Sequence, residues 1–265
     1  MNKVKCISII TVVFNGIECI ENTIVSVINQ SYDNIDFVII DGSSTDGTQS
    51  VIKKYESNIS CWVSEPDKGI YDAMNKGASL ARGEWILFMN CGDLFESRDT
   101  IANVVPYLSK EANIVYGDTL LSYGNKKQLK FKPAKEFTDI IYGIPFCHQS
   151  VFVELDIFKK YKFNLSYRYA ADYNFFLSIF KNNEYRYKKV PFPISVYDMN
   201  GFSNGIGALG ALKEYYLIAQ KYYPNSRSTL GHYLRLKRYV YKMKIKLFVP
   251  KINISLVRNS RNTNN

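Results

Sequence analysis

The sequence of 265 residues contains no run of about 18 apolar residues, which a membrane-spanning helix requires. Its five cysteines include no Cys-x-x-Cys pair, so they predict neither a zinc ribbon nor a disulfide framework, and a reducing, cytoplasmic location is expected. Histidine is scarce as well, with two residues. Apolar residues nevertheless make up 46% of the chain, which is enough for one sizeable core.

Acidic residues are absent after Glu214. Eleven of the 34 lysines and arginines follow that point, so the other 23 nearly balance the 24 acids that precede it. Apolar residues with the spacing of an amphipathic helix lie among these cations: Leu236, Tyr239, Val240, Met243 and Leu247. Such a helix either packs on its own domain or lies on an anionic membrane surface, and we favour the membrane. Nucleic acid is not expected as a partner.

Strand-like apolar runs alternate with helix-like spacings in the first half of the chain. The expected strands cover residues 7–13, 35–40, 59–63, 84–89 and 113–116. The expected helices lie between them, near 20–28, 51–55 and 70–81. This order predicts an α/β fold with a mainly parallel sheet flanked by helices, in which ligands bind at the carboxyl ends of the strands.

Several of these strand ends carry residues with useful chemistry. The carboxylate of Asp41 can accept an N–H from the edge of a nucleobase, or it can simply stabilise a turn. Asp93, in a turn loosened by glycine, can hold Mg²⁺ or Mn²⁺ against a diphosphate, or it can cap the next helix. Lys68 and the nearby backbone amides precede a helix and can face a phosphate group, and Asp72 lies just inside that helix.

Six segments, taken in order, resemble the family-2 glycosyltransferases, which are inverting enzymes with the GT-A fold. These segments are 7–15, 26–32, 38–43, 46–48, 69–77 and 81–93. Residues 65–75 resemble the branch that builds bacterial surface polysaccharides. The resemblance implies a GT-A-like nucleotide-diphospho-sugar transferase domain over 1–204, followed by a helical, basic extension over 205–265. Within the domain, residues 1–95 would bind the nucleotide sugar and 96–204 would face the acceptor.

The resemblance also implies roles for individual residues at the donor site, where the base is usually uracil. The donor-binding positions are Thr11, Val13, Phe14, Asn15, Asp41, Ser43, Lys68, Asp72, Asn90 and Asp93. Asp93 matches the last acid of the family's metal-binding Asp-x-Asp element, whereas Asn90 and Gly92 replace its other acids. With one carboxylate left, we expect the cofactor, Mn²⁺ or Mg²⁺, to arrive largely with the donor.

Asp172 matches the general base of the family's Glu-Asp element, with Ala171 in place of the glutamate. Inversion at the anomeric carbon requires one carboxylate to take the proton of the acceptor hydroxyl, whereas an aspartate in the first turn of a helix is also common for structural reasons. His148 and Gln149 are expected on the acceptor side. For His148, a place near the metal and a buried structural role remain alternatives.

These features predict hexosyl or N-acetylhexosaminyl transfer from a nucleotide diphosphate donor, preferably UDP-linked. The expected acceptor is a saccharide or a lipid-linked oligosaccharide in capsule, O-antigen or exopolysaccharide synthesis, at the inner face of the membrane. One alternative is a nicotinamide-dependent oxidoreductase, because Gly205, Gly207 and Gly210 fit a dinucleotide-binding fingerprint. No acid follows at the required distance, so we interpret these glycines as a hinge before a helix. A non-enzymatic basic protein that binds membrane or nucleic acid is the other alternative.

Overall fold

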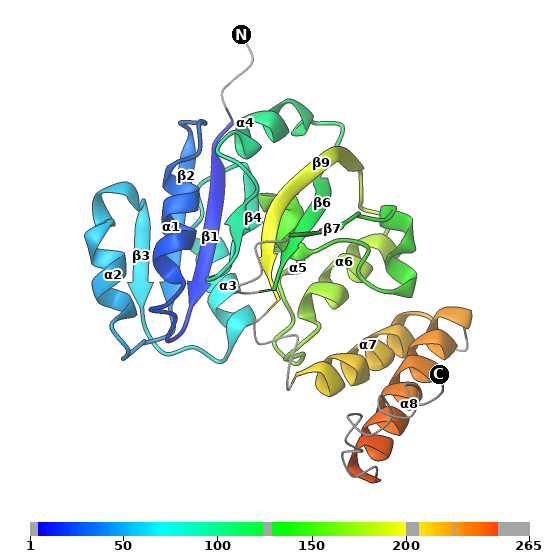
Figure 1. Cartoon of the computed structure of the whole chain (residues 1–265). Helices are drawn as coiled ribbons and strands as arrows, with labels where there is room; N and C mark the ends of the chain where they lie inside the picture. Colours follow the sequence, from blue (N-terminus) through cyan, green and yellow to red (C-terminus); the bar gives the residue numbers. More distant parts are fainter. Residues whose placement is uncertain (1–4, 124–128, 200–206, 225, 249–265) are drawn as a thin grey trace, which may run out of the picture.

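The computed structural model describes residues 5–123, 129–199, 207–224 and 226–248 (Figure 1). Its strands form one sheet in the order β3-β2-β1-β4-β8-β6-β9-β5, and β7 pairs with β6. The strands are β1 (Ile7–Val13), β2 (Ile35–Asp41), β3 (Cys61–Ser64), β4 (Trp85–Phe88), β5 (Leu94–Phe95), β6 (Ile114–Ser122), β7 (Lys130–Lys132), β8 (Val151–Glu154) and β9 (Tyr187–Asp198).

Helices connect these strands and follow the last of them (Figure 1). The α-helices are α1 (Ile20–Ile28), α2 (Thr48–Lys54), α3 (Ile70–Leu80), α4 (Thr100–Val104), α5 (Leu155–Tyr161), α6 (Ala171–Lys181), α7 (Ala208–Tyr222) and α8 (Arg227–Phe248). The short 3₁₀ helices are η1 (Glu56–Asn58), η2 (Val105–Tyr107), η3 (Phe137–Tyr142) and η4 (His148–Ser150). No helix of the described segments has both the length and the apolar character to cross a membrane.

The first four long strands confirm the predicted parallel arrangement. Strand β1 pairs in parallel with both β2 and β4, and β2 pairs in parallel with β3. In this register Val13 lies opposite Asp41, which in turn lies opposite Ser64. The carboxyl ends of β1, β2 and β3 therefore meet at one edge of the sheet, as the βαβ order requires.

The second half of the sheet is mixed, unlike the parallel sheet that the first half predicts. Strand β8 pairs antiparallel with both β4 and β6, whereas β6 and β9 run parallel. Strand β6 extends to Ser122, well beyond the predicted end at residue 116. Strand β9 contains Pro191 and Pro193, and its pairing with β6 shifts register between Tyr116 and Thr119. Prolines are tolerated at such irregularities because fewer ladder hydrogen bonds are required there.

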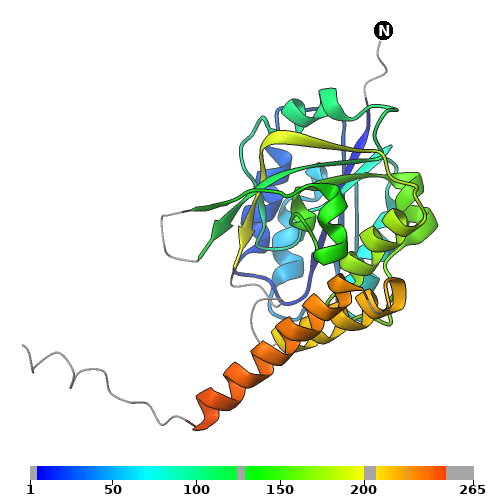
Figure 2. The same cartoon turned by 90° about the vertical axis from the view of Figure 1, so that its right-hand side faces the viewer.

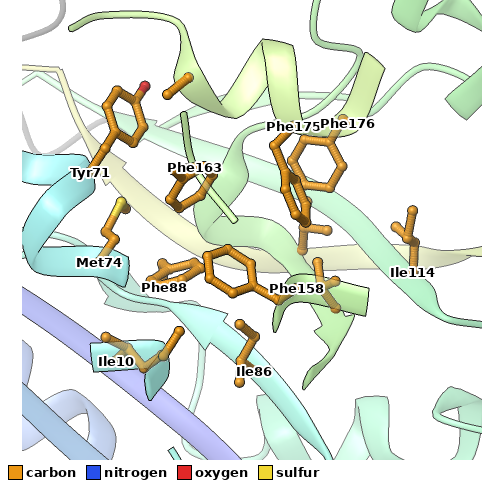
Figure 3. Close-up of a cluster of buried hydrophobic side chains, with 14 of the residues drawn as sticks. Ile10, Tyr71, Met74, Ile86, Phe88, Ile114, Phe158, Phe163, Phe175 and Phe176 are labelled. Atoms are coloured by element: carbon orange, nitrogen blue, oxygen red, sulfur yellow. The ribbon is translucent and has the colours of Figure 1, made fainter. Parts of the chain in front are cut away.

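Alternate residues of the central strands enter two separate hydrophobic cores. Ile7 and Ile9 of β1 face α1, α2 and α4, whereas Ile10 and Val12 face α3, α5 and α6. Aromatic rings dominate the second core, which Figure 3 shows around Phe88. Because α3 and α6 share this core, it fixes the start of α6 relative to the strand ends that face α3.

Helices α7 and α8 lie beside the sheet domain and pack against each other (Figure 1). Helix α8 continues past the domain, so that its C-terminal end projects away from it (Figure 2). Two helices therefore follow the sheet domain, as expected for the basic extension. The hinge interpretation is wrong for Gly210, because α7 begins at Ala208 and includes Gly210 in its first turn; Gly205 lies outside the described residues.

Candidate active site

Asp41 ends β2 beneath the loops that follow β1 and β3. Its Oδ2 accepts hydrogen bonds from the Ser64 hydroxyl at 2.6 Å and from the Ser44 amide at 3.0 Å. Its Oδ1 is buried and has no hydrogen-bond partner among the described residues. A buried carboxylate oxygen without a partner costs free energy, so it indicates a place where a ligand N–H can bind.

The loops above Asp41 are tied to each other. The Asn15 side chain accepts the Thr45 amide at 2.9 Å, and the Asn15 amide donates to the Ser44 hydroxyl at 2.7 Å. Asn15 and Ser43 both have left-handed backbone conformations, with φ of 49° and 63°. These contacts hold the two loops in one fixed shape at the sheet edge.

Phe14 projects from the first of these loops, with 66% of its surface exposed. Its ring lies next to Gly42, where an added Cβ would come within 3.4 Å of the ring and 2.6 Å of Asp67. An exposed aromatic ring that approaches the residue after Asp41 suits a nucleobase, which stacks on rings and donates N–H groups. Glycine at position 42 keeps this approach open.

The other residues predicted for the donor site lie in several environments. Thr11 and Val13 are buried within β1: the Thr11 hydroxyl donates to the Met89 carbonyl at 2.7 Å, and the Val13 side chain packs beneath Gly16 of the following loop. Lys68 is exposed at the start of α3. The Asp72 carboxylate, in the first turn of α3, accepts the Lys68 amide at 2.9 Å.

Asp93 lies in the turn after β4, which Gly92 enters with φ of 98°. The carboxylate is 4% exposed and accepts hydrogen bonds from the Gln149 side chain at 2.9 Å and the Asp198 amide at 3.0 Å. Burial is the main cause that raises the pKa of Asp93 to about 6, although the hydrogen bonds from the Asp198 amide and Gln149 lower it. Asp93 is therefore more readily protonated than an exposed aspartate.

Asp172 lies in the first turn of α6 and is held from three sides. Its Oδ1 accepts the Tyr71 hydroxyl at 3.1 Å and the Tyr173 amide at 2.8 Å. Its Oδ2 lies 3.4 Å from Nδ1 of His148. The other ring nitrogen of His148 lies 3.0 Å from the Asn90 side-chain nitrogen, and Oδ1 of Asn90 is buried without a partner among the described residues.

The predicted site residues from Asn90 onward thus form one connected polar cluster. Helix η4 carries His148 to Asp172 and Gln149 to Asp93, so neighbouring residues join the candidate base to the candidate metal ligand. Tyr71 on α3 adds a link from the donor half of the domain to Asp172. A carboxylate held in this way, with a small exposed surface, can accept a proton from a hydroxyl group placed beside it.

Two acidic residues near this cluster were not predicted as site residues. A Cβ on Gly92 would lie 3.5 Å from Oδ2 of Asp198, so this second carboxyl group approaches the Asp93 turn. Glu214 on α7 binds the segment just before Asp172. Asp198 could have been found as a strand-end carboxylate, but the two prolines of β9 argue against a strand in this part of the sequence. No sequence pattern signals the second.

The sequence profile described as glycosyl transferase family 2 matches residues 8–195, which contain all the residues of this cluster except Asp198 and Glu214. The chain belongs to that family. A Mycobacterium tuberculosis relative named "PGL/p-HBAD biosynthesis glycosyltransferase" is 30% identical over 163 residues, covering 59% of this chain and 62% of the relative. This chain therefore spans less than two thirds of the length of that family-2 relative.

The fold is also shared with two solved glycosyltransferases. S. aureus TarS in complex with UDP-GlcNAc is 16% identical, with a TM-score of 0.65, over 85% of this chain and 69% of TarS. The mannosyltransferase PcManGT from Pyrobaculum calidifontis, in complex with GDP-Man and Mn²⁺, is 14% identical, with a TM-score of 0.65, over 97% of this chain and 79% of PcManGT. The fold is accordingly the GT-A fold that the sequence predicts.

Proposed function

We propose that the chain is an inverting glycosyltransferase that uses a nucleotide diphosphate sugar, preferably UDP-linked, and a saccharide acceptor. The observation that carries this proposal is the cluster in which His148 and Gln149 join Asp172 to Asp93. It lies on the same domain as the partnerless Asp41 oxygen and the exposed Phe14 ring. Binding groups for a base and a proton acceptor for a hydroxyl are both needed for this reaction.

In the proposed reaction, the acceptor hydroxyl oxygen attacks C1 of the donor sugar from the face opposite the diphosphate. The new C–O bond forms as the bond between C1 and the diphosphate oxygen breaks, and the electron pair of that bond leaves on the nucleoside diphosphate. Asp172 takes the hydroxyl proton. Tyr71 and the Tyr173 amide hold the other carboxylate oxygen, which keeps Oδ2 directed to the His148 side, where the acceptor would bind.

A divalent cation fits the site only with help from the donor. Within the described part of the chain, no three His, Cys, Asp or Glu side chains are grouped to hold an ion. Asp93, the partnerless Oδ1 of Asn90 and the nearby carboxyl of Asp198 offer oxygen ligands, which Mn²⁺ and Mg²⁺ prefer. When bound with the donor, the ion would neutralise charge on the leaving diphosphate.

A cavity of about 450 Å³ between η3 and α7–α8, whose lining includes neither His148 nor Asp172, is a candidate site for the part of the acceptor away from the reacting hydroxyl. Its lining combines aromatic and charged side chains, as saccharides require: Lys135, Asp139, Tyr142, Tyr215, His232 and Arg235. Tyr215 of this lining stacks on Tyr173, the residue after Asp172, with ring centroids 4.5 Å apart. The volume lies in the usual range for small-molecule pockets.

The acceptor in this function would be lipid-linked, and the chain would bind peripherally to an anionic membrane, at the cytoplasmic face and in a surface-polysaccharide pathway. The support comes from α8, on which Leu234 and Tyr241 are exposed beside Lys237 and Arg238. Apolar side chains next to cations suit an interface of anionic lipid. The oxidoreductase alternative loses its basis, because Gly210 lies in α7 against the ring of Tyr169.

A thermal-shift panel tests the donor class. The melting temperature would be measured with UDP, GDP, dTDP, CMP, NAD and NADP, each with and without Mn²⁺. A ligand that binds the folded state raises the melting temperature by mass action. At a ligand concentration a hundredfold above Kd, the free energy of unfolding increases by about 2.7 kcal/mol. We expect a Mn²⁺-dependent rise with UDP. A rise with NAD or NADP alone would contradict the proposal. Once the donor is known, the acceptor is identified by measuring the release of nucleoside diphosphate with a panel of saccharides.

A further inference from the structure

Helix α7 binds the backbone just before α6 through the carboxylate of Glu214. Its Oε1 accepts the Arg168 amide, and its Oε2 accepts the amides of Tyr169 and Ala170, each at 2.8 Å. Three amides on one carboxylate are charge-assisted hydrogen bonds, which are stronger than bonds between neutral groups. The negative charge also lies at the N-terminal end of α6, where the helix dipole favours it.

Two further residues of α7 contact the same region. Gly210, one turn before Glu214, lies so close to Tyr169 that a Cβ would overlap its ring. Tyr215 stacks on Tyr173 with ring centroids 4.5 Å apart. The face of α7 formed by these three residues therefore fits the segment around residue 170 closely, and this contact explains the glycine at position 210.

The segment that Glu214 holds leads directly to the candidate base. The Tyr169 carbonyl lies 3.1 Å from the Tyr71 hydroxyl, which also lies 3.1 Å from Oδ1 of Asp172. Asp172 itself follows Ala170 by two residues and accepts the Tyr173 amide at the same oxygen. A shift of the backbone at 168–170 would therefore move both Asp172 and the hydroxyl group that orients it.

We propose that Glu214 is a positioning residue for Asp172, so that α7 belongs to the transferase centre although it lies in the basic extension. The role rests on the glycosyl transfer proposed above. Glu214 acts through the backbone at 168–170 and touches neither donor nor acceptor. Displacing a reacting group by about 1 Å can lower a rate by about a hundredfold, so a small shift of this segment is sufficient.

The test compares Glu214→Gln with the wild type and with Glu184→Gln. The glutamine in the first variant would keep one acceptor oxygen but turn an amide group toward the backbone N–H groups. Glu184 lies just beyond the other end of α6, in an exposed pair with Lys160. Hydrogen exchange would be followed by mass spectrometry in the peptide covering 166–175. Transfer would be followed as nucleoside diphosphate release, with the donor and acceptor found by the panels above.

For Glu214→Gln we expect exchange in that peptide to be about tenfold faster, kcat to fall about tenfold or more, and the donor thermal shift to be unchanged. Glu184→Gln should match the wild type in all three. Gly210→Ala, which separates α7 from Tyr169 without removing the carboxylate, should lower kcat in the same way.

Wild-type kcat in Glu214→Gln, despite faster exchange, would overturn the positioning role. So would equal losses of donor binding and kcat, since these would indicate general destabilisation. A wild type that transfers no sugar would instead contradict the proposed function, while the exchange result would still report on the contact.

Discussion

At the scale of single residues, the environment of Asp93 changes the chemistry of its carboxyl group. Burial raises the pKa of Asp93 from its ordinary 3.8 to about 6, although Gln149 and the Asp198 amide partly oppose this. A carboxyl group with a raised pKa in the folded state stabilises the fold below its unfolded pKa, and this contribution is lost as the pH rises through 6. At neutral pH, the ionised carboxylate of Asp93 therefore lowers the free energy of unfolding.

Asp93→Asn should therefore be more stable than the wild type at neutral pH when metal is removed with EDTA. As the pH rises from about 4 to about 7, the unfolding free energy of the wild type should fall relative to the variant by up to about 3 kcal/mol, since each pKa unit corresponds to about 1.36 kcal/mol. Urea unfolding at several pH values measures this difference. Asparagine suits the site because the Gln149 amide can rotate to pair with it.

The matched control for Asp93 is Asp156→Asn, which makes the same chemical change at an exposed aspartate on α5. The stability difference between this variant and the wild type should not follow the same pH window. A constant difference between wild type and Asp93→Asn across that window would show that Asp93 titrates as an ordinary surface carboxylate.

At the scale of elements, α8 has the clearest separate role to test. Replacing Lys237 and Arg238 by glutamine removes two exposed cations from the face that carries Leu234 and Tyr241. Because each cation near an anionic surface contributes about 1 kcal/mol, binding to vesicles that contain phosphatidylglycerol should weaken about tenfold or more. Co-sedimentation with these vesicles, and with vesicles of phosphatidylcholine alone, measures the effect.

The matched control for α8 replaces Lys53 and Lys54, two neighbouring exposed cations on α2. This pair should leave vesicle binding unchanged, since α2 lies on the sheet domain away from the projecting helix (Figure 1). Two results would argue that α8 serves only to pack against α7. One is equal vesicle binding by the two double variants, and the other is equal binding of the wild type to vesicles with and without phosphatidylglycerol.

Element boundaries were predictable where one physical signal acted alone. Strands β1, β2 and β4 are near-continuous apolar runs because both faces are covered by helices, so their positions follow from the sequence. Strand β9 was missed because Pro191 and Pro193 normally argue against a strand, and only the register shift opposite β6 admits them. The antiparallel pairing of β8 with β4 and β6 could not be predicted, because local sequence patterns do not determine which strands become neighbours.

At the scale of the whole molecule, the candidate site is assembled from distant parts of the chain. The strand-end rule locates Asp41 and Asp93, because parallel strands bring their carboxyl ends together. The contacts of Asp172 with Tyr71 and His148 join segments that are far apart in the sequence, and they arise from packing in the shared aromatic core. The sequence indicates Asp172 only through resemblance, and neither Asp198 nor Glu214 is among the predicted site residues.

The measurement that tests the central claim most directly is the transfer rate of Asp172→Asn. Asparagine keeps the shape of the side chain but cannot take the proton of an acceptor hydroxyl, so the donor thermal shift should persist while kcat falls about a hundredfold or more. Nucleoside diphosphate release with the identified donor and acceptor gives the rate. Turnover equal to that of the wild type would show that the reaction does not depend on Asp172 as its base.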